Sequence, residues 1–211
     1  MKTDDFIGML STGAGPAPCV RLASRLAPVL AAGFLASAAG ALLSLGPVPS
    51  AMLGGAALWT KLVYAAAIAL ACVWLARQLC RPGAPARLAG VAALVVVAAM
   101  LIAGLASLLA TPSPERLRHL LGATALRCPW VIMGLALPAL ALLLRVLREV
   151  GPTRPALAGF AAGLLAGAVG AEGYALACLE ESIAFIALWY SAGILLTGLL
   201  GAALGARLLR W

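Results

Sequence analysis

The sequence predicts an all-α membrane protein with six transmembrane helices, short loops, and both termini on the cytoplasmic side. The chain has 211 residues, of which 64% are hydrophobic and only 10% are charged, too few charges to cover the surface of a soluble domain. Six apolar runs each approach the roughly 20 residues that a membrane-spanning helix needs. Lys and Arg residues are also distributed unequally between the two sets of connecting segments, which predicts the orientation.

The six apolar runs are separated by segments that stop helices. In chain order the predicted spans are 27–45, 57–76, 88–109, 129–145, 156–175 and 183–205. The sequences GPVP, RPGAP, TPSP and GPTRP lie between them, and proline there fixes φ and removes an amide donor, which ends a helix. We expect no signal peptide, because the first 20 residues contain two Asp and two Pro and no apolar core.

The distribution of basic residues predicts the orientation of the spans. With the N-terminus inside, the inner segments hold eleven of the 15 Lys and Arg residues, and the outer connections hold three. This asymmetry places both termini in the cytoplasm. Because the basic residues flank the apolar spans, we interpret the net charge of +8 as membrane anchoring rather than nucleic-acid binding. The chain then divides into a cytoplasmic tail, residues 1–20, and a transmembrane domain, residues 21–211.

The connection between the third and fourth spans should contain a short helix on the outer surface. Ser113 is a suitable N-cap, Pro114 suits the first helical position, and Glu115 follows it.

Small residues recur every four positions in the last two spans. Such spacing puts one flat face on each helix and predicts close helix packing in the membrane. The residues of these two faces are Gly159, Gly163 and Gly167 in the fifth span, and Gly193, Thr197, Gly201 and Gly205 in the sixth.

Ionisable side chains inside the spans are few. Lys61 lies about one turn inside the outer end of the second span, and Glu172 lies near the outer end of the fifth. We predict that they pair directly or through water, since they share a depth; alternatively, Lys61 reaches the headgroups on its own. The spans contain no Asp and no His, which argues against a small transporter or channel, because coupled transport usually needs such groups at mid-membrane.

Two of the five cysteines should face the outer compartment. Cys128 begins the fourth span and Cys178 lies between the fifth and sixth, whereas Cys19, Cys72 and Cys80 lie in or near the cytoplasmic side. Spans four and five are consecutive and should be antiparallel neighbours, so their outer ends can lie close together. We therefore predict that the outer pair lies within ~7 Å between Cα atoms, in an oxidising compartment where disulfides persist. A disulfide, a thiol sensor, a soft-metal site and two unpaired packing residues all remain open. A thiol oxidoreductase that uses quinone is disfavoured, because it would need a second outer pair.

The N-terminal tail is the sizeable cytoplasmic element. Thr3 can cap a helix, and the next two acids suit its positive N-terminal end. Apolar residues follow on one helical face, so the tail is either an amphipathic segment on the membrane or a peptide that orders on a protein partner. The residues of this candidate docking segment are Thr3, Asp4, Asp5, Phe6, Ile7, Met9 and Leu10.

Five short motifs follow one another along the chain: MKTDDFIGML at the start, WTKLVYA around Lys61, RCPW around Cys128, YALACLEESIAFIALWY, and LLGAALGARLLRW at the end. In this order they resemble the NrsF family of six-span inner-membrane anti-sigma factors. The resemblance implies a cytoplasmic tail that holds an extracytoplasmic-function sigma factor of the SigF type, and outward cysteines that respond to oxidant or metal stress. On this chain it assigns the tail to docking and Cys128 with Cys178 to sensing. One departure is Ala177, where the family pattern has His before the second cysteine, and this disfavours metal binding more than a disulfide.

The sequence is therefore interpreted as an anti-sigma factor of the bacterial inner membrane. We expect it to contact membrane lipid and a sigma factor and to bind no nucleic acid directly. We do not expect it to be an enzyme or to need a cofactor. A small transporter or channel and a membrane thiol oxidoreductase are the alternatives.

Overall fold

The computed structural model describes residues 3, 22–79 and 86–209 of the chain. In these ranges the chain is helical and contains no strand, and six helical segments are long and apolar enough to cross a membrane, as the sequence predicted. The segments are α2 (Leu22–Leu45), α3 (Ala56–Leu79), α4 (Arg87–Ala110), α6 (Cys128–Val150), α7 (Pro155–Ala175) and a last segment made of α8 (Ile183–Phe185), η3 (Ile186–Tyr190) and α9 (Ser191–Leu208). Apart from Thr3, the predicted docking segment in the tail lies outside the described residues.

The observed helices begin and end within a few residues of the predicted spans. The largest differences are five residues: α2 begins at Leu22 rather than at 27, and α6 continues to Val150 rather than ending at 145. The apolar run stops at Arg145, but the helix continues until Gly151, which has φ of +65° and serves as the C-cap. A left-handed residue of this kind ends a helix at little cost when it is glycine. The hydropathy of the sequence thus marked the apolar part of the helix and not its charged last turn.

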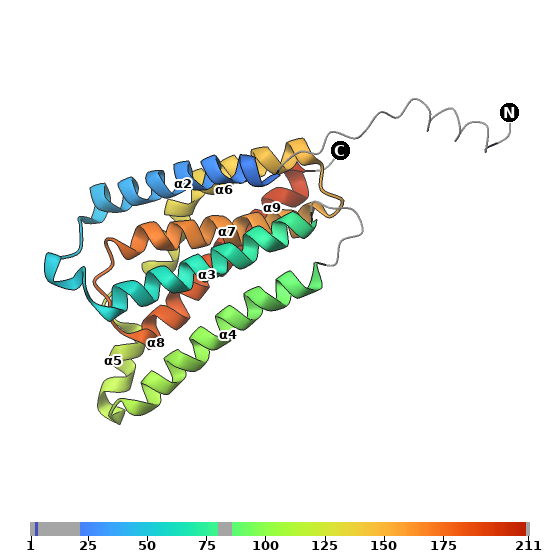
Figure 1. The fold of residues 1–211 in the computed structure, drawn as a ribbon. Helices are drawn as coiled ribbons and strands as arrows, with labels where there is room; N and C mark the ends of the chain where they lie inside the picture. Colours follow the sequence, from blue (N-terminus) through green and yellow to red (C-terminus); the bar gives the residue numbers. More distant parts are fainter. Residues whose placement is uncertain (1–2, 4–21, 80–85, 210–211) are drawn as a thin grey trace.

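The six segments form an antiparallel bundle with two distinct ends (Figure 1). We call the end where α2 begins and α9 finishes the terminal end; residues 151–154 connect α6 to α7 there. We call the opposite end the cysteine end; residues 46–55, 111–127 and 176–182 connect the helices there. The beginning of α2 and the end of α9 therefore lie on the same side of the bundle, as an even number of spans requires.

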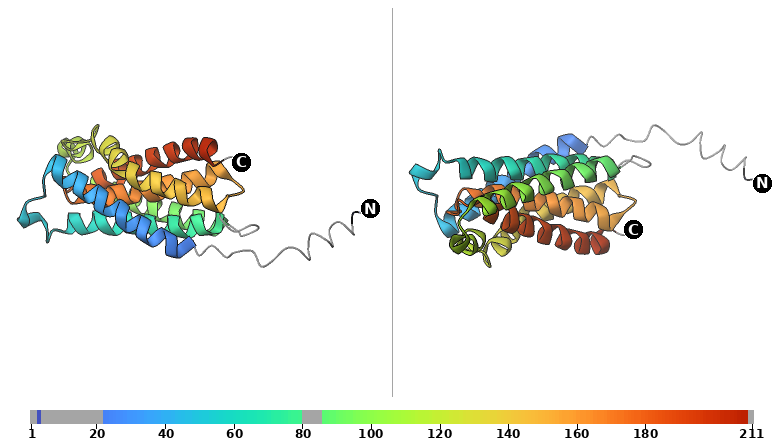
Figure 2. Two further views of the ribbon diagram at one scale, coloured as in Figure 1. Left: turned by 90° about the horizontal axis from the view of Figure 1, so that it is seen from above. Right: turned by 90° about the horizontal axis from the view of Figure 1, so that it is seen from below.

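Helix α7 lies at the centre of the bundle. It packs against α2, α3, α6 and α9, and 72% of its most apolar window is buried. Helices α2 and α4 lie on opposite faces, and α4, whose window is only 22% buried, packs mainly on α3 and the start of the last segment (Figure 2). The core is therefore organised around one helix made largely of Ala and Gly.

Both small-residue faces pack closely, as predicted, and most of their residues pack against each other; Gly193 instead faces Ile132 of α6. A Cβ added to Gly159 would lie 2.8 Å from the Cα of Gly205, and one added to Gly163 would lie 2.8 Å from the Cα of Gly198. Real Cβ atoms do not approach a backbone this closely, so both positions exclude any larger side chain. This contact brings the backbones of the two helices together along most of their length.

Two local features of the cysteine end differ from the simplest expectation. The last segment contains one turn of π-helix, Ile186–Tyr190, between α8 and α9. The third connection forms a 3₁₀ turn, η2 (Ser113–Glu115), followed by the short helix α5 (Arg116–Leu121). The expected helix is present, but Ser113 does not cap it. Pro112 is the N-cap of η2 and Glu115 is the N-cap of α5, and neither supplies a side-chain cap hydrogen bond.

Candidate cysteine site

Cys128 and Cys178 lie together at the cysteine end of the bundle. Cys128 is the first residue of α6, where its amide donates to the carbonyl of Thr124 at 2.9 Å. Cys178 lies in the connection from α7 to α8. Both are free thiols and both are buried, with 0% and 4% of their surfaces exposed. The structure thus brings together two thiols that are 50 positions apart in the sequence and covers both of them.

Two tyrosines share this buried space with the thiols. Tyr174 comes from the last turn of α7 and Tyr190 from the end of the π-turn, and their ring centroids are 5.8 Å apart. Tyr174 lies beside both thiols, and Tyr190 lies beside Cys178 and Tyr174. The Tyr190 hydroxyl is fully buried and has no hydrogen-bond partner among the described residues. We refer to Cys128, Cys178, Tyr174 and Tyr190 as the cysteine site.

Glu180 connects the two segments that carry the cysteines. Its Oε1 accepts hydrogen bonds from the amides of Ala123 and Thr124, at 2.7 and 3.1 Å, and from the Thr124 hydroxyl at 3.0 Å. Gly122 makes the approach possible, since its φ is +54° and an added Cβ would lie 2.7 Å from the Glu180 carboxyl carbon. Charged acceptors form stronger hydrogen bonds than neutral ones. The carboxylate therefore holds residues 122–124, just before Cys128, against the segment that follows Cys178.

Further contacts close this end of the bundle. The Trp189 indole donates from Nε1 to the carbonyl of Leu120 at 2.9 Å, which fixes α5 to the π-turn. The amide of Val48 donates to the carbonyl of Leu176 at 3.0 Å, which fixes the first connection to the cysteine loop. All three connections at this end are therefore linked around the cysteine site.

Lys61 has a different partner from the one that the sequence predicted. It is only 2% exposed, and its Nζ donates to the carbonyl of Cys178 at 2.7 Å. It forms no direct ion pair with Glu172, which is half-buried on α7; the ion pairs among the described residues are Arg25–Glu149 and His119–Glu115. The cysteine loop offers a backbone acceptor beside the first turns of α3, and the ammonium donates to it. An approach of Glu172 through water stays a prediction.

A small cavity of about 10 Å³ adjoins Cys178, enough for roughly one water molecule. Lys61, Glu181, Val48 and Met52 are among the residues that line it. Glu181 is exposed, so this cavity lies between the surface and the Cys178 side of the site.

The sequence identified the two cysteines and Lys61 but missed the residues that hold them. No motif or spacing in the sequence marks Tyr174 or Tyr190 as part of a site, and Glu180 is only one of two adjacent acids. Cys72 lies buried in α3, apart from Cys128 and Cys178, and Cys19 and Cys80 are outside the described residues. The described residues contain no cluster of three or more His, Cys, Asp and Glu that could hold a metal ion, so two thiols are the available soft ligands.

The fold and the site define a polytopic helical membrane protein whose distinctive chemistry is a buried pair of thiols. A family model described as NrsF, negative regulator of sigma F, matches residues 10–211. The chain belongs to the NrsF family.

Two relatives match over the full length of both chains. The chain is 40% identical over 221 residues to an anti-sigma-F factor NrsF of Caulobacter vibrioides (strain NA1000 / CB15N). It is 38% identical over 217 residues to a probable anti-sigma-F factor NrsF of Azospira oryzae (strain ATCC BAA-33 / DSM 13638 / PS). No solved structure matches at a significant level. The family is one of regulators rather than enzymes.

Proposed function

We propose that this protein is an anti-sigma factor of the bacterial inner membrane that holds an extracytoplasmic-function sigma factor of the SigF type and releases it when the cysteine site reacts. Membership of a family of negative regulators of sigma F supports the regulatory role. The observation that carries the sensing role is the burial of two free thiols, Cys128 and Cys178, under one linked cover.

Reaction of the thiols would change this end of the bundle in a defined way. With a small-molecule disulfide as oxidant, one cysteine thiolate attacks the disulfide and releases one thiol, and the second cysteine displaces the other. A Cys128–Cys178 bond forms, the disulfide of the oxidant breaks, and its two thiols carry away two electrons and two protons. A soft metal cation would instead bind both thiolates and displace two protons.

The docking role belongs to the cytoplasmic tail. The described inner connection between α6 and α7 is only four residues long, residues 151–154, so it offers little surface for a protein partner. The tail can present Phe6, Ile7, Met9 and Leu10 on one helical face, which suits a hydrophobic groove on a sigma factor. Asp4 and Asp5 would meet basic side chains that the sigma factor otherwise uses on DNA phosphates.

The conformational change that follows reaction of the cysteine site would reach the tail through the closely packed helices. Cys128 begins α6, and Tyr174 ends α7, so a new bond at the site pulls on two neighbouring helices. A Cβ on Gly170 of α7 would lie 2.7 Å from the carbonyl oxygen of Ile132 in α6, so these helices cannot approach further without moving their neighbours. Packed interfaces of this kind shift as units rather than deforming smoothly.

The test is co-purification of the sigma factor with the full-length chain from detergent, together with expression of the target genes. We expect the wild-type protein to retain the sigma factor. The double variant Phe6→Ala, Leu10→Ala should lose it and raise target expression, at unchanged protein level and membrane insertion.

Ser11→Ala with Thr12→Ala is the matched control, since it changes two tail residues outside the proposed apolar face. Retention of the sigma factor by the Phe6/Leu10 variant, with the target genes still silent, would remove the tail from the docking mechanism.

A further inference from the structure

An open groove runs between α6 and α9 at the terminal end of the bundle, and we infer that it binds an anionic phospholipid. Its volume is about 440 Å³, within the range of small-molecule sites. It lies at the opposite end from the cysteine site, so the inference is independent of the proposed function.

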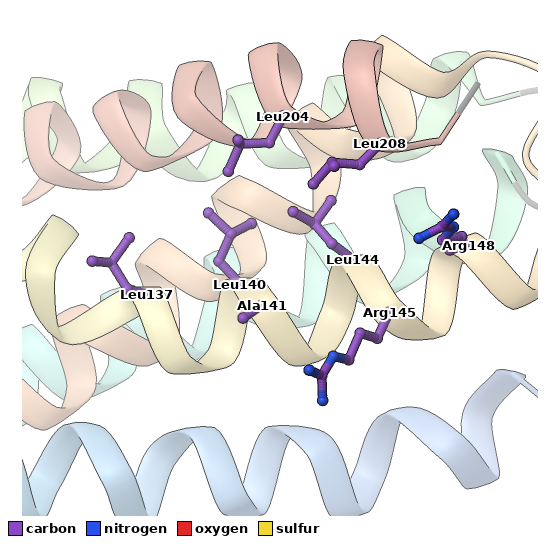
Figure 3. Close-up of a pocket in the computed structure, with 8 residues that line it drawn as sticks. All are labelled: Leu137, Leu140, Ala141, Leu144, Arg145, Arg148, Leu204 and Leu208. Carbon is purple, nitrogen blue, oxygen red and sulfur yellow. The ribbon is translucent and has the colours of Figure 1, made fainter.

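The greater part of the groove is apolar. Leu140 and Leu144 form its buried floor, with 1% and 6% exposed, and Leu204 and Leu208 of α9 point toward them (Figure 3). Leu137 and Leu208 form the rim and are 47% and 48% exposed. A surface of this composition fits a hydrocarbon chain that lies between the two helices.

The end of the groove is cationic. Arg145 and Arg148 complete its lining on the last turns of α6, and both are exposed. The neighbouring acid, Glu149, pairs with Arg25 of α2. Neither Arg145 nor Arg148 forms an ion pair with any residue that the structure describes. The Arg148 guanidinium lies at the terminal end of the groove, whereas that of Arg145 points away from α9 (Figure 3). Because both side chains are exposed and long, both can turn toward an anion bound there, and guanidinium groups match the geometry of phosphate oxygens.

The length of the groove matches one leaflet of a membrane. From Leu137 to Arg148 the lining extends 11 positions along α6, or about 16 Å at 1.5 Å per residue. Half the hydrocarbon thickness of a bilayer is about 15 Å. A phospholipid in that leaflet would place its acyl chain against the leucines and its phosphate beside the two arginines.

The groove extends to the middle of the membrane-spanning part of α6, and this position favours a lipid over a protein segment as its occupant. Leu137 lies in the middle of the spanning helix α6, where a water-soluble peptide would lose the hydration of its backbone. Basic pockets between transmembrane helices are a recognised way to hold anionic headgroups. The combination of an apolar slot and a cationic end predicts selectivity for phosphatidylglycerol over phosphatidylcholine, since only the former has a net negative charge.

The experiment reconstitutes the full chain in nanodiscs of phosphatidylcholine with a minor fraction of phosphatidylglycerol and counts retained lipids by native mass spectrometry. We expect the wild-type protein to retain phosphatidylglycerol preferentially. The double variant Arg145→Gln, Arg148→Gln should lower its apparent affinity by about tenfold or more, as expected for the loss of charged hydrogen bonds. Ala141→Phe, which fills the groove and leaves both arginines in place, should lower retention as well.

Arg87→Gln with Arg118→Gln is the matched control, because it removes the same charge from exposed positions away from the groove. Equal retention by this control and by the Arg145/Arg148 variant would overturn the inference. Normal retention of phosphatidylglycerol by Ala141→Phe would also overturn the inference, because the arginines would then act only as general membrane anchors. A groove occupied by the chain's own tail or by a second copy would leave lipid retention unchanged in both groove variants and would overturn the inference equally.

Discussion

At the scale of single residues, we expect Cys128 and Cys178 to determine how the cysteine end responds to oxidants and soft metals. Treatment of the purified chain with oxidised glutathione should form one bond between them, because we predict their Cα atoms to lie within ~7 Å. Peptide mapping by mass spectrometry checks the pairing. In cells, Cys128→Ser with Cys178→Ser should abolish induction of the target genes by oxidant or soft metal, and Cys72→Ser should leave it intact.

A normal stress response in the Cys128/Cys178 double variant would contradict the sensing role. Packing would then be the better explanation for the burial of these thiols.

Glu180 is expected to control how fast reagents reach the thiols. Glu180→Ala removes three hydrogen bonds to residues 123–124 and should raise the rate of thiol alkylation by roughly tenfold or more, since each bond contributes on the order of 1 kcal/mol. Labelling with a small maleimide, followed by mass spectrometry of the peptides that carry Cys128 and Cys178, measures that rate.

Glu181→Ala is the control, because Glu181 is the adjacent exposed acid and accepts none of these bonds. If both variants are labelled at the same rate, the Glu180 contact does not hold the cover closed.

The roles of individual residues at this end could be predicted only in part from the sequence. The cysteines and Lys61 stand out because thiols and charges are rare in this chain. The partner of Lys61 is a backbone carbonyl, which leaves no trace in a pattern of side chains. Glu180 acts on residues 56 and 57 positions away, and its role depends on the fold of two separate connections.

At the scale of helices, the contact between α7 and α9 should be intolerant of even one added carbon. Gly163→Ala would place a Cβ 2.8 Å from the Cα of Gly198, and such overpacking costs on the order of 1–3 kcal/mol. Thermal unfolding in detergent should therefore show a lower midpoint for this variant.

Gly134→Ala is the matched control, since it is an exposed helical glycine with nothing within 4 Å of the added carbon. It should be neutral or more stable, by up to about 1 kcal/mol from the gain in helix propensity. A destabilisation of similar size in both variants would contradict the close-contact explanation.

Helices were easier to predict than their interruptions. Hydropathy and proline positions located all six spans, because membrane thickness fixes how long an apolar helix must be. The π-turn Ile186–Tyr190 was not predicted, since its sequence, IALWY, is as apolar as an ordinary span. The turn depends on neighbours such as Leu120, whose carbonyl accepts from Trp189.

At the scale of the whole molecule, the beginning of α2 and the end of α9 both lie at the terminal end of the bundle. The excess of Arg at that end predicts that it faces the cytoplasm. A reporter fused after Arg210 should behave as cytoplasmic, and one inserted in residues 112–126 as periplasmic. Alkaline phosphatase and fluorescent-protein fusions provide the two readouts. A periplasmic C-terminus would place the cysteine site in the reducing compartment and contradict its role as an outward sensor.

The contrast between α7 and α4 also bears on how the sequence can change over time. The most apolar window of α7 is 72% buried among four neighbouring helices, whereas that of α4 is 22% buried. Most side chains on α7 are therefore restricted in size by their neighbours, but most positions on α4 need only remain hydrophobic. Neutral drift should accumulate on α4 and stay rare on α7, so lineages that diverge in this protein will differ first on the helix that contributes least to its core.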